Sequence, residues 1–311
     1  MPERIARRRC ALGLVILVSG MLLAAAPAAA YLRDFQLVSA GSLPGSTTIR
    51  AALPTCPPGK IAIGTGARLL PPFANVGLDR LLLDFGARRG FVGGAETDAN
   101  LGRWRVSGRA FCAQDTAAVP TAGANASYLK HRSTASAVSP NTSAPSHEAV
   151  ANCPSGANAV GGGGYVLGPT TKLALDTLQL ARPGGTGWRV RAHEVDPTGA
   201  AWHVVSFAIC ANYTTSTPTG PYFGPKEDAI TSYSSSATGT GQVSATATCQ
   251  LPGTSAIGGG AAVQGATPLG PPPADVALTY SFPGPNAWVA RAQDTDPSAT
   301  PYRLLSVVVC G

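Results

Sequence analysis

The sequence predicts an all-β fold of three tandem, disulfide-stapled, β-sandwich-like repeats. The first observation is the cysteine spacing, since all but the cysteine at position 10 fall into three pairs: Cys56 and Cys112, Cys153 and Cys210, Cys249 and Cys310. The first members of these pairs recur every 97 and 96 residues, so one unit is repeated three times. The second observation is the content of 37 Gly and 27 Pro, typical of short strands joined by tight turns.

Each repeat begins with a cysteine, a turn and a cluster of glycines. The second repeat reads Cys153-Pro154-Ser155-Gly156 and continues with Val160 and four glycines at 161–164. Such glycines bind phosphate where a helix opens directly after them, and no helix-like stretch follows here. We therefore interpret them as part of a strand that is crowded by a neighbour or carries a bulge.

An alternating apolar strand and a hairpin complete each repeat. An aromatic residue stands eight positions before the second cysteine of each pair, at Trp104, Trp202 and Tyr302. Because eight is even, the aromatic ring and the half-cystine leave the strand on the same face. We expect this face to form the core, as in an immunoglobulin-like sandwich. In an alternative, prism-like arrangement, the three repeats close on one another around a pseudo-threefold axis.

The chain divides into a leader, three units and two linkers. We predict a signal peptide over residues 1–30, because four arginines precede an apolar stretch that ends at a small-residue cleavage site. The units are predicted at 31–113, 128–211 and 222–311, with linkers at 114–127 and 212–221. The mature chain has no apolar stretch long enough for a membrane span. We expect a secreted or periplasmic protein, with a composition typical of bacteria, in an oxidising space.

The histidines do not form a pattern that predicts catalysis or metal binding. All four, at positions 131, 147, 193 and 203, fall in the second unit, and none recurs in the others. The six cysteines are used in pairs, so we expect no catalytic residue, no metal and no cofactor. On the second hairpin, Arg189, Arg191 and His193 alternate with apolar residues. We interpret them as a solvated face and as candidate ligand-facing residues.

Recurrent acids and tryptophans also have structural explanations. Asp98, Asp196 and Asp296 lie at predicted hairpin turns, where a carboxylate accepts hydrogen bonds from nearby backbone N–H groups. We favour this role over a calcium ligand or a general base. Trp188 and Trp288 begin strands whose next alternate residues are apolar, which favours packing in the core over stacking on sugar rings.

The charge of the chain is uneven. Residues 31–113 carry a net charge of +5, with arginines that include Arg68 and Arg109, whereas residues 212–311 carry −2. A basic face could bind anionic cell-wall polymer, lipid head groups or nucleic acid. We favour a soluble surface rich in arginine. No fold signature of nucleic-acid binding accompanies the charge, so we expect no nucleic-acid partner.

The order Cys-Pro-x-Gly, Ile/Val-Gly-x-Gly, Trp-x-Val-x-Ala and Ala-x-Cys-Ala resembles that of uncharacterised exported bacterial β-repeat proteins. The best copy ends with residues 188–192 and 208–211. This resemblance implies an exported β-rich repeat and no particular activity. Because no catalytic group recurs, we predict a non-enzymatic surface or matrix protein that binds an extracellular partner, such as a glycan or cell-wall polymer, through its repeated modules. The alternatives are a carbohydrate-binding module protein and an extracellular polysaccharide hydrolase.

Overall fold

The structure is a computed structural model of the chain. Its described residues are 30–70, 75–84, 88–97, 102–116, 127–169, 171–181, 185–215, 231–250, 256–267, 271–295 and 300–310. These residues form strands, and no helix among them is long and apolar enough to cross a membrane. The predicted all-β class is confirmed. Residues 1–29 of the predicted signal peptide and most of both predicted linkers lie outside the described residues, whereas Ala30 begins the first strand.

Each repeat contributes six strands. The first repeat holds β1 (Ala30–Gly41), β2 (Ile49–Ala52), β3 (Lys60–Leu70), β4 (Val76–Asp84), β5 (Arg89–Glu96) and β6 (Arg105–Thr116). The second holds β7 (Ser127–Val138), β8 (Ser146–Asn152), β9 (Asn158–Leu167), β10 (Leu173–Leu180), β11 (Gly187–Glu194) and β12 (His203–Thr215). The third holds β13 (Thr231–Ser235), β14 (Gln242–Thr248), β15 (Ala256–Gly265), β16 (Val276–Pro283), β17 (Ala287–Asp294) and β18 (Tyr302–Cys310).

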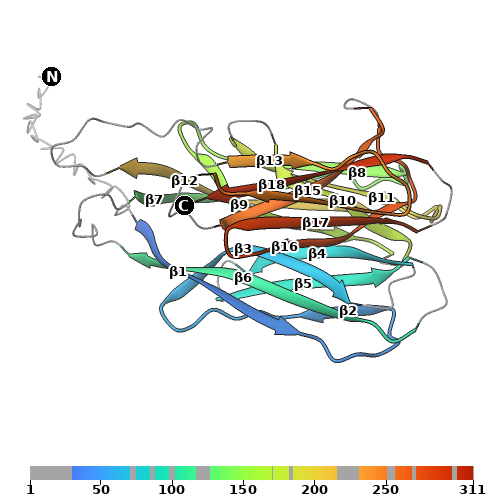
Figure 1. Ribbon diagram of the computed structural model, residues 1–311, viewed down its shortest axis with the longest axis horizontal. Helices are drawn as coiled ribbons and strands as arrows, with labels where there is room; N and C mark the ends of the chain where they lie inside the picture. The colour runs from blue at the N-terminus through green and yellow to red at the C-terminus, as the bar shows by residue number, and fades with distance from the viewer. Residues whose placement is uncertain are drawn as a thin grey trace, which may run out of the picture.

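The repeats share their sheets. Within a repeat, the first, sixth and third strands form one half-sheet, and the fourth, fifth and second form another. The third strand then pairs with the fourth strand of a different repeat: β3 with β16, β9 with β4, and β15 with β10. Three six-stranded sheets result, each built from two repeats, with strands running along the long axis of the molecule (Figure 1). Pairing of β1 with β7 joins two of these sheets edge to edge.

The two half-sheets of one repeat also contact each other face to face, so each repeat is sandwich-like. In the second repeat, Ser206 Oγ on β12 donates a hydrogen bond of 2.8 Å to the Trp188 carbonyl on β11. The equivalent bond in the third repeat joins Ser306 to the Trp288 carbonyl, also at 2.8 Å. Three sandwich-like repeats are therefore closed around a pseudo-threefold axis, as in the prism-like alternative.

The glycine clusters are explained by this closure. At Gly64 on β3 the nearest atom of another repeat is the Ile257 carbonyl oxygen on β15, and at Gly258 on β15 it is the Val160 oxygen on β9. Gly161 on β9 completes the cycle, because it lies against the Ile63 oxygen on β3. The third strands of all three repeats thus meet at glycines, where backbone faces backbone, and the interpretation of a crowded strand is confirmed.

The disulfides and their aromatic neighbours form the core of each repeat. The bridges are Cys56–Cys112, Cys153–Cys210 and Cys249–Cys310. The aromatic residues eight positions before the second cysteines, at 104, 202 and 302, are buried. Trp188 and Trp288 are buried as well, so none of the four tryptophans presents a ring to a sugar. The disulfides indicate an oxidising, extracytoplasmic environment.

Peptide mapping without reduction tests this framework directly. Because each bridge closes a loop within one repeat, digestion of the oxidised protein is expected to yield three cross-linked peptide pairs, each from a single repeat. Reduction before digestion should remove all three pairs from the mass spectrum. Any cross-linked pair that joins two repeats would contradict the arrangement.

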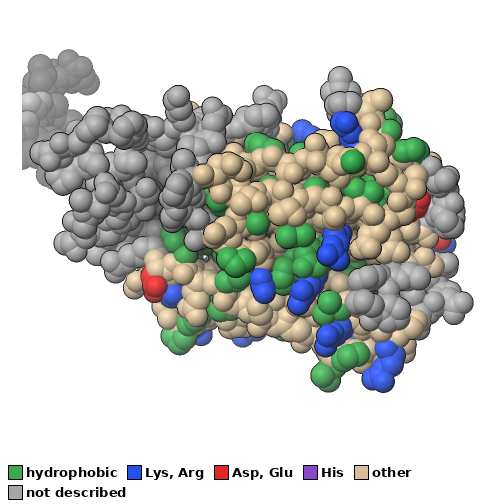
Figure 2. Space-filling model, in the orientation of Figure 1, with side chains coloured by type: hydrophobic (Ala, Val, Ile, Leu, Met, Phe, Trp, Pro, Cys, Tyr) green, Lys and Arg blue, Asp and Glu red, His purple; other side chains and the backbone are tan. Residues whose placement is uncertain are grey.

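The outer faces of the sheets differ in character. On the face shown in Figure 2, Lys and Arg side chains lie among hydrophobic ones over β3, β16 and β17, whereas acidic side chains are visible only toward the ends of the molecule. The third sheet, built from β13, β18, β15, β10, β11 and β8, carries a pocket instead.

Candidate functional site

The fourth strand of every repeat has a bulge at the same position. The pairing register shifts after Leu78, after Leu175 and after Leu278, which leaves one extra residue in each strand: Asp79, Asp176 or Thr279. All three are buried, with at most 3% of their surface exposed. The fold therefore places a polar side chain in the interior three times, and each repeat provides different partners for it.

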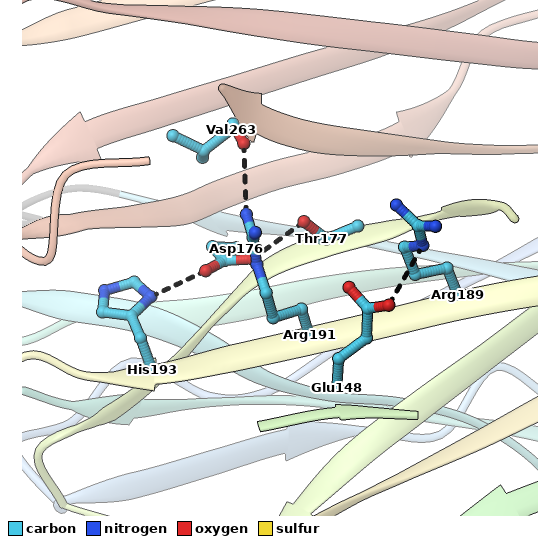
Figure 3. Close-up of polar contacts among 7 residues, drawn as sticks. All are labelled: Glu148, Asp176, Thr177, Arg189, Arg191, His193 and Val263. Atoms are coloured by element: carbon cyan, nitrogen blue, oxygen red, sulfur yellow. Dashed lines mark hydrogen bonds and ion pairs between the residues drawn. The ribbon is translucent and has the colours of Figure 1, made fainter. Parts of the chain in front are cut away.

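In the second repeat the bulge residue is held by a network (Figure 3). Asp176 Oδ1 accepts hydrogen bonds from Arg191 Nε at 2.8 Å and from Thr177 Oγ1 at 2.8 Å. Its other oxygen, Oδ2, lies 3.0 Å from His193 Nδ1. Arg191 also reaches across to the third repeat, where Nη2 donates to the Val263 carbonyl at 3.4 Å.

The network keeps Asp176 ionised. Burial raises the pKa of this carboxyl, but the hydrogen bond and charge of His193 together with those of Arg191 hold the pKa below its usual value. As an acceptor, the carboxylate fixes a proton on His193 Nδ1. His193 Nε2 is shielded from solvent and has no hydrogen-bond partner in the described part of the chain. A buried polar atom without a partner requires an explanation, and a hydrogen bond to a bound molecule is one.

A pocket of about 240 Å³ lies over this network, at the junction of the second and third repeats. One side is formed by Asp176, Arg191, His193 and Glu194, and the other by prolines of the connection Pro271–Ala274. Ser146, at the start of β8, also lines it. The pocket therefore combines charged and apolar lining residues.

Two features distinguish this junction from the other two in the described part of the chain. The connection between β15 and β16 spans 266–275, twice the length of the equivalent connections 71–75 and 168–172. The partners of the acid also differ. In the register of the first repeat, Gly93 and Ala95 occupy the positions of Arg191 and His193, so Arg80 is the charged partner that Asp79 has among the described residues.

The structure brings together two of the three candidate ligand-facing residues. Arg191 and His193 line the pocket, while Arg189 lies apart and pairs with Glu148 at 3.4 Å. The interpretation of a solvated face is wrong for His193, which is 5% exposed. His193 is buried because its ring is bound by Asp176, which lies on the neighbouring strand β10. Asp176 was missed, although an acid inside the apolar run Leu173–Leu180 was a usable signal.

The remaining candidates do not add to this site. Asp196 is exposed, whereas Asp98 and Asp296 lie outside the described residues. His147 contacts the Trp202 ring edge-on, with ring centroids 4.3 Å apart. Within the described ranges, no group of three His, Cys, Asp or Glu side chains is arranged to hold a metal ion.

Comparison with known proteins gives no independent indication of the function. No protein-family model and no curated protein matches the sequence. The resemblance to exported bacterial repeats accordingly stays a prediction, and the function is argued from the site itself.

Proposed function

We propose that this chain is an exported, non-enzymatic glycan-binding protein of the secreted or periplasmic space, and that the pocket between its second and third repeats holds a neutral, hydroxyl-rich sugar unit. The observation that carries the proposal is the composition of the pocket. A buried polar network and a run of prolines line the same concave site, and this combination of orienting polar groups and apolar surface is typical of ligand sites.

The charges favour a neutral ligand. Arg191 is already paired with the ionised Asp176, and Glu194 adds a second carboxylate to the lining. An anion would therefore meet two carboxylates, while Arg191 and His193 are already bound to Asp176. Hydroxyl groups fit better, because they can accept from the part-exposed Arg191 and donate to Glu194. The apolar face of a sugar ring could lie against the prolines.

Filling the pocket is expected to abolish sugar binding. Ser146 is exposed at the rim, so Ser146→Phe should place a ring in the pocket without disturbing the core. Binding of a panel of neutral oligosaccharides would be measured by calorimetry, and we expect at least about a tenfold loss of affinity for the best ligand. Glu194→Gln should weaken binding less, because it removes one charged acceptor.

The matched control is Ser136→Phe, which makes the same change at an exposed position of β7 in another sheet. It should leave affinity unchanged. Equal losses in both variants, or tight binding by Ser146→Phe, would show that the pocket is not the site.

A polysaccharide hydrolase is the second candidate, because Asp176 and Glu194 place two carboxyl groups in one pocket. Asp176, however, accepts hydrogen bonds from Arg191 and Thr177 and is bound to His193. A carboxylate so occupied is a poor nucleophile or base. Release of reducing ends from a bound oligosaccharide, lost in Glu194→Gln, would favour the hydrolase.

A further inference from the structure

Two arginines on the sheet built from β14, β17, β16, β3, β6 and β1 are held against one aromatic ring. Arg68 on β3 lies over the Phe282 ring, with its guanidinium carbon 4.8 Å from the ring centroid. Arg109 on β6 lies 4.4 Å from the same centroid and donates a hydrogen bond of 2.6 Å to the Pro283 carbonyl. Cation–π contacts and this bond fix two like charges close together.

A third arginine extends the cluster across the sheet. Tyr280 on β16 is the direct cross-strand partner of both Arg68 on β3 and Arg291 on β17. Since neighbouring strands lie about 4.8 Å apart, the backbones of these two arginines are separated by roughly 10 Å. Arg291 lies over the Tyr280 ring at 5.1 Å, and the Tyr280 and Phe282 rings are 5.2 Å apart. We call these five residues, 68, 109, 280, 282 and 291, the arginine–aromatic face.

This face lacks the acids that would normally balance it. In the described part of the chain, no Asp or Glu forms an ion pair with Arg68, Arg109 or Arg291. Desolvation, followed by repulsion from Arg68, lowers the pKa of Arg109. Figure 2 shows basic and hydrophobic side chains intermingled over β3, β16 and β17. Holding like charges together is unfavourable, and a bound anion would relieve that repulsion.

We propose that the arginine–aromatic face binds an acidic polysaccharide, with carboxylate or sulfate groups on the guanidiniums and a sugar ring on Tyr280. Arginine binds such oxyanions through two parallel N–H donors, and its aromatic support pre-organises the side chain. The site is distinct from the pocket of the third sheet. Two carboxylates, those of Asp176 and Glu194, line that pocket. The arginine–aromatic face does not depend on the glycan proposed for the pocket.

Two observations favour a polysaccharide over single-stranded nucleic acid. Nucleic-acid grooves present aromatic rings on which successive bases stack. Here Phe282 is 4% exposed beneath the arginines, and one face of Tyr280 is taken by Arg291, so little ring surface is left for bases. The three disulfides also indicate an extracytoplasmic environment, where polysaccharides are the common polyanions.

The test is binding of dextran sulfate and of a polyuronate to the full mature chain, with uncharged dextran and single-stranded DNA as competitors. We expect both acidic polysaccharides to bind and the affinity to fall as salt rises. Arg68→Gln with Arg109→Gln should lower the affinity at least about tenfold and flatten the salt dependence. Arg68→Lys with Arg109→Lys keeps the charge but loses the planar fork, so an intermediate loss is expected.

The matched control is Arg189→Gln with Arg303→Gln, which removes two positive charges from the third sheet. It should change the affinity less than about twofold, and thermal melting would verify that all variants are folded. An equal loss of affinity in the control would show that net charge alone controls binding, and it would contradict the proposed site. Tighter binding of single-stranded DNA than of either polysaccharide would overturn the choice of partner. Failure of the pocket variant Ser146→Phe to bind neutral sugar bears only on the pocket.

Discussion

Gly161→Ala is expected to destabilise the protein by about 3 kcal/mol or more, because it forces the three repeats apart at their axis. A Cβ at this position would overlap the Ile63 carbonyl oxygen of the first repeat. That oxygen belongs to the backbone of β3, at a bulge residue whose neighbours Ala62 and Gly64 are both paired with β6, so the overlap is relieved only by moving the β3 backbone. Urea unfolding followed by tryptophan fluorescence would measure the loss.

The effect should be graded among the glycines of the axis. Gly258→Ala is expected to be similarly severe, because its Cβ would overlap the Val160 oxygen. At Gly64 the added Cβ would lie 3.2 Å from the Ile257 oxygen, so a small shift would accommodate it at lower cost. Gly41→Ala is the control, since its nearest atom would be 3.8 Å away. Equal effects at all four positions would contradict backbone contact at the axis.

Local spacing was sufficient to predict the interior of each repeat. A strand turns its side chains to alternate faces, so the even separation of Trp104 and Cys112 fixed their common face from sequence alone. The recurrence of this pair in the other repeats identified the unit. Both residues are buried, as are their counterparts in the second and third repeats.

The junctions between repeats could not be predicted in the same way. Pairing of β10 with β15 joins Thr177 to Ala262 and Leu178 to Ala261, residues more than eighty positions apart. An edge-to-edge pairing of this kind requires only an unpaired strand on each side and leaves no periodic signal. The pocket could not be predicted for the same reason, because its charged residues and its prolines come from different repeats.

Asp176→Asn is expected to destabilise the protein at pH 7 by about 3 kcal/mol, because it removes the counter-charge of Arg191 and the acceptor of His193 Nδ1. Asp79→Asn, at the same position of the first repeat, should have no such cost. Asp79 is bound only by the neighbouring Arg80, and its Oδ1 is buried without a partner among the described residues. Urea unfolding of both variants and the parent protein at several pH values would measure the contrast.

The two acids should also give opposite pH dependences. The pKa of Asp176 is lowered in the folded state, so its stabilising contribution is complete above the unfolded value of about 3.9 and is lost as the pH falls below it. Asp176→Asn should therefore approach the parent protein on acidification. Burial raises the pKa of Asp79 against the effect of Arg80, so folding becomes less favourable as the pH rises above about 4. The advantage of Asp79→Asn should grow over that range.

The third repeat shows why this contrast bears on function. Thr279 occupies the equivalent bulge, and its hydroxyl donates a hydrogen bond of 3.5 Å to the Arg291 carbonyl. The polar group at this bulge therefore has a hydrogen-bond partner without carrying a charge. A buried carboxylate is thus not required by the bulge itself. Among the contacts of the three bulge residues within the described ranges, an arginine and a histidine together hold the acid at position 176, which lines the pocket. Equal destabilisation by Asp79→Asn and Asp176→Asn would mean that the bulge itself requires a carboxylate. A loss confined to Asp176→Asn would show that the carboxylate is required by its contacts with Arg191 and His193 and not by the bulge.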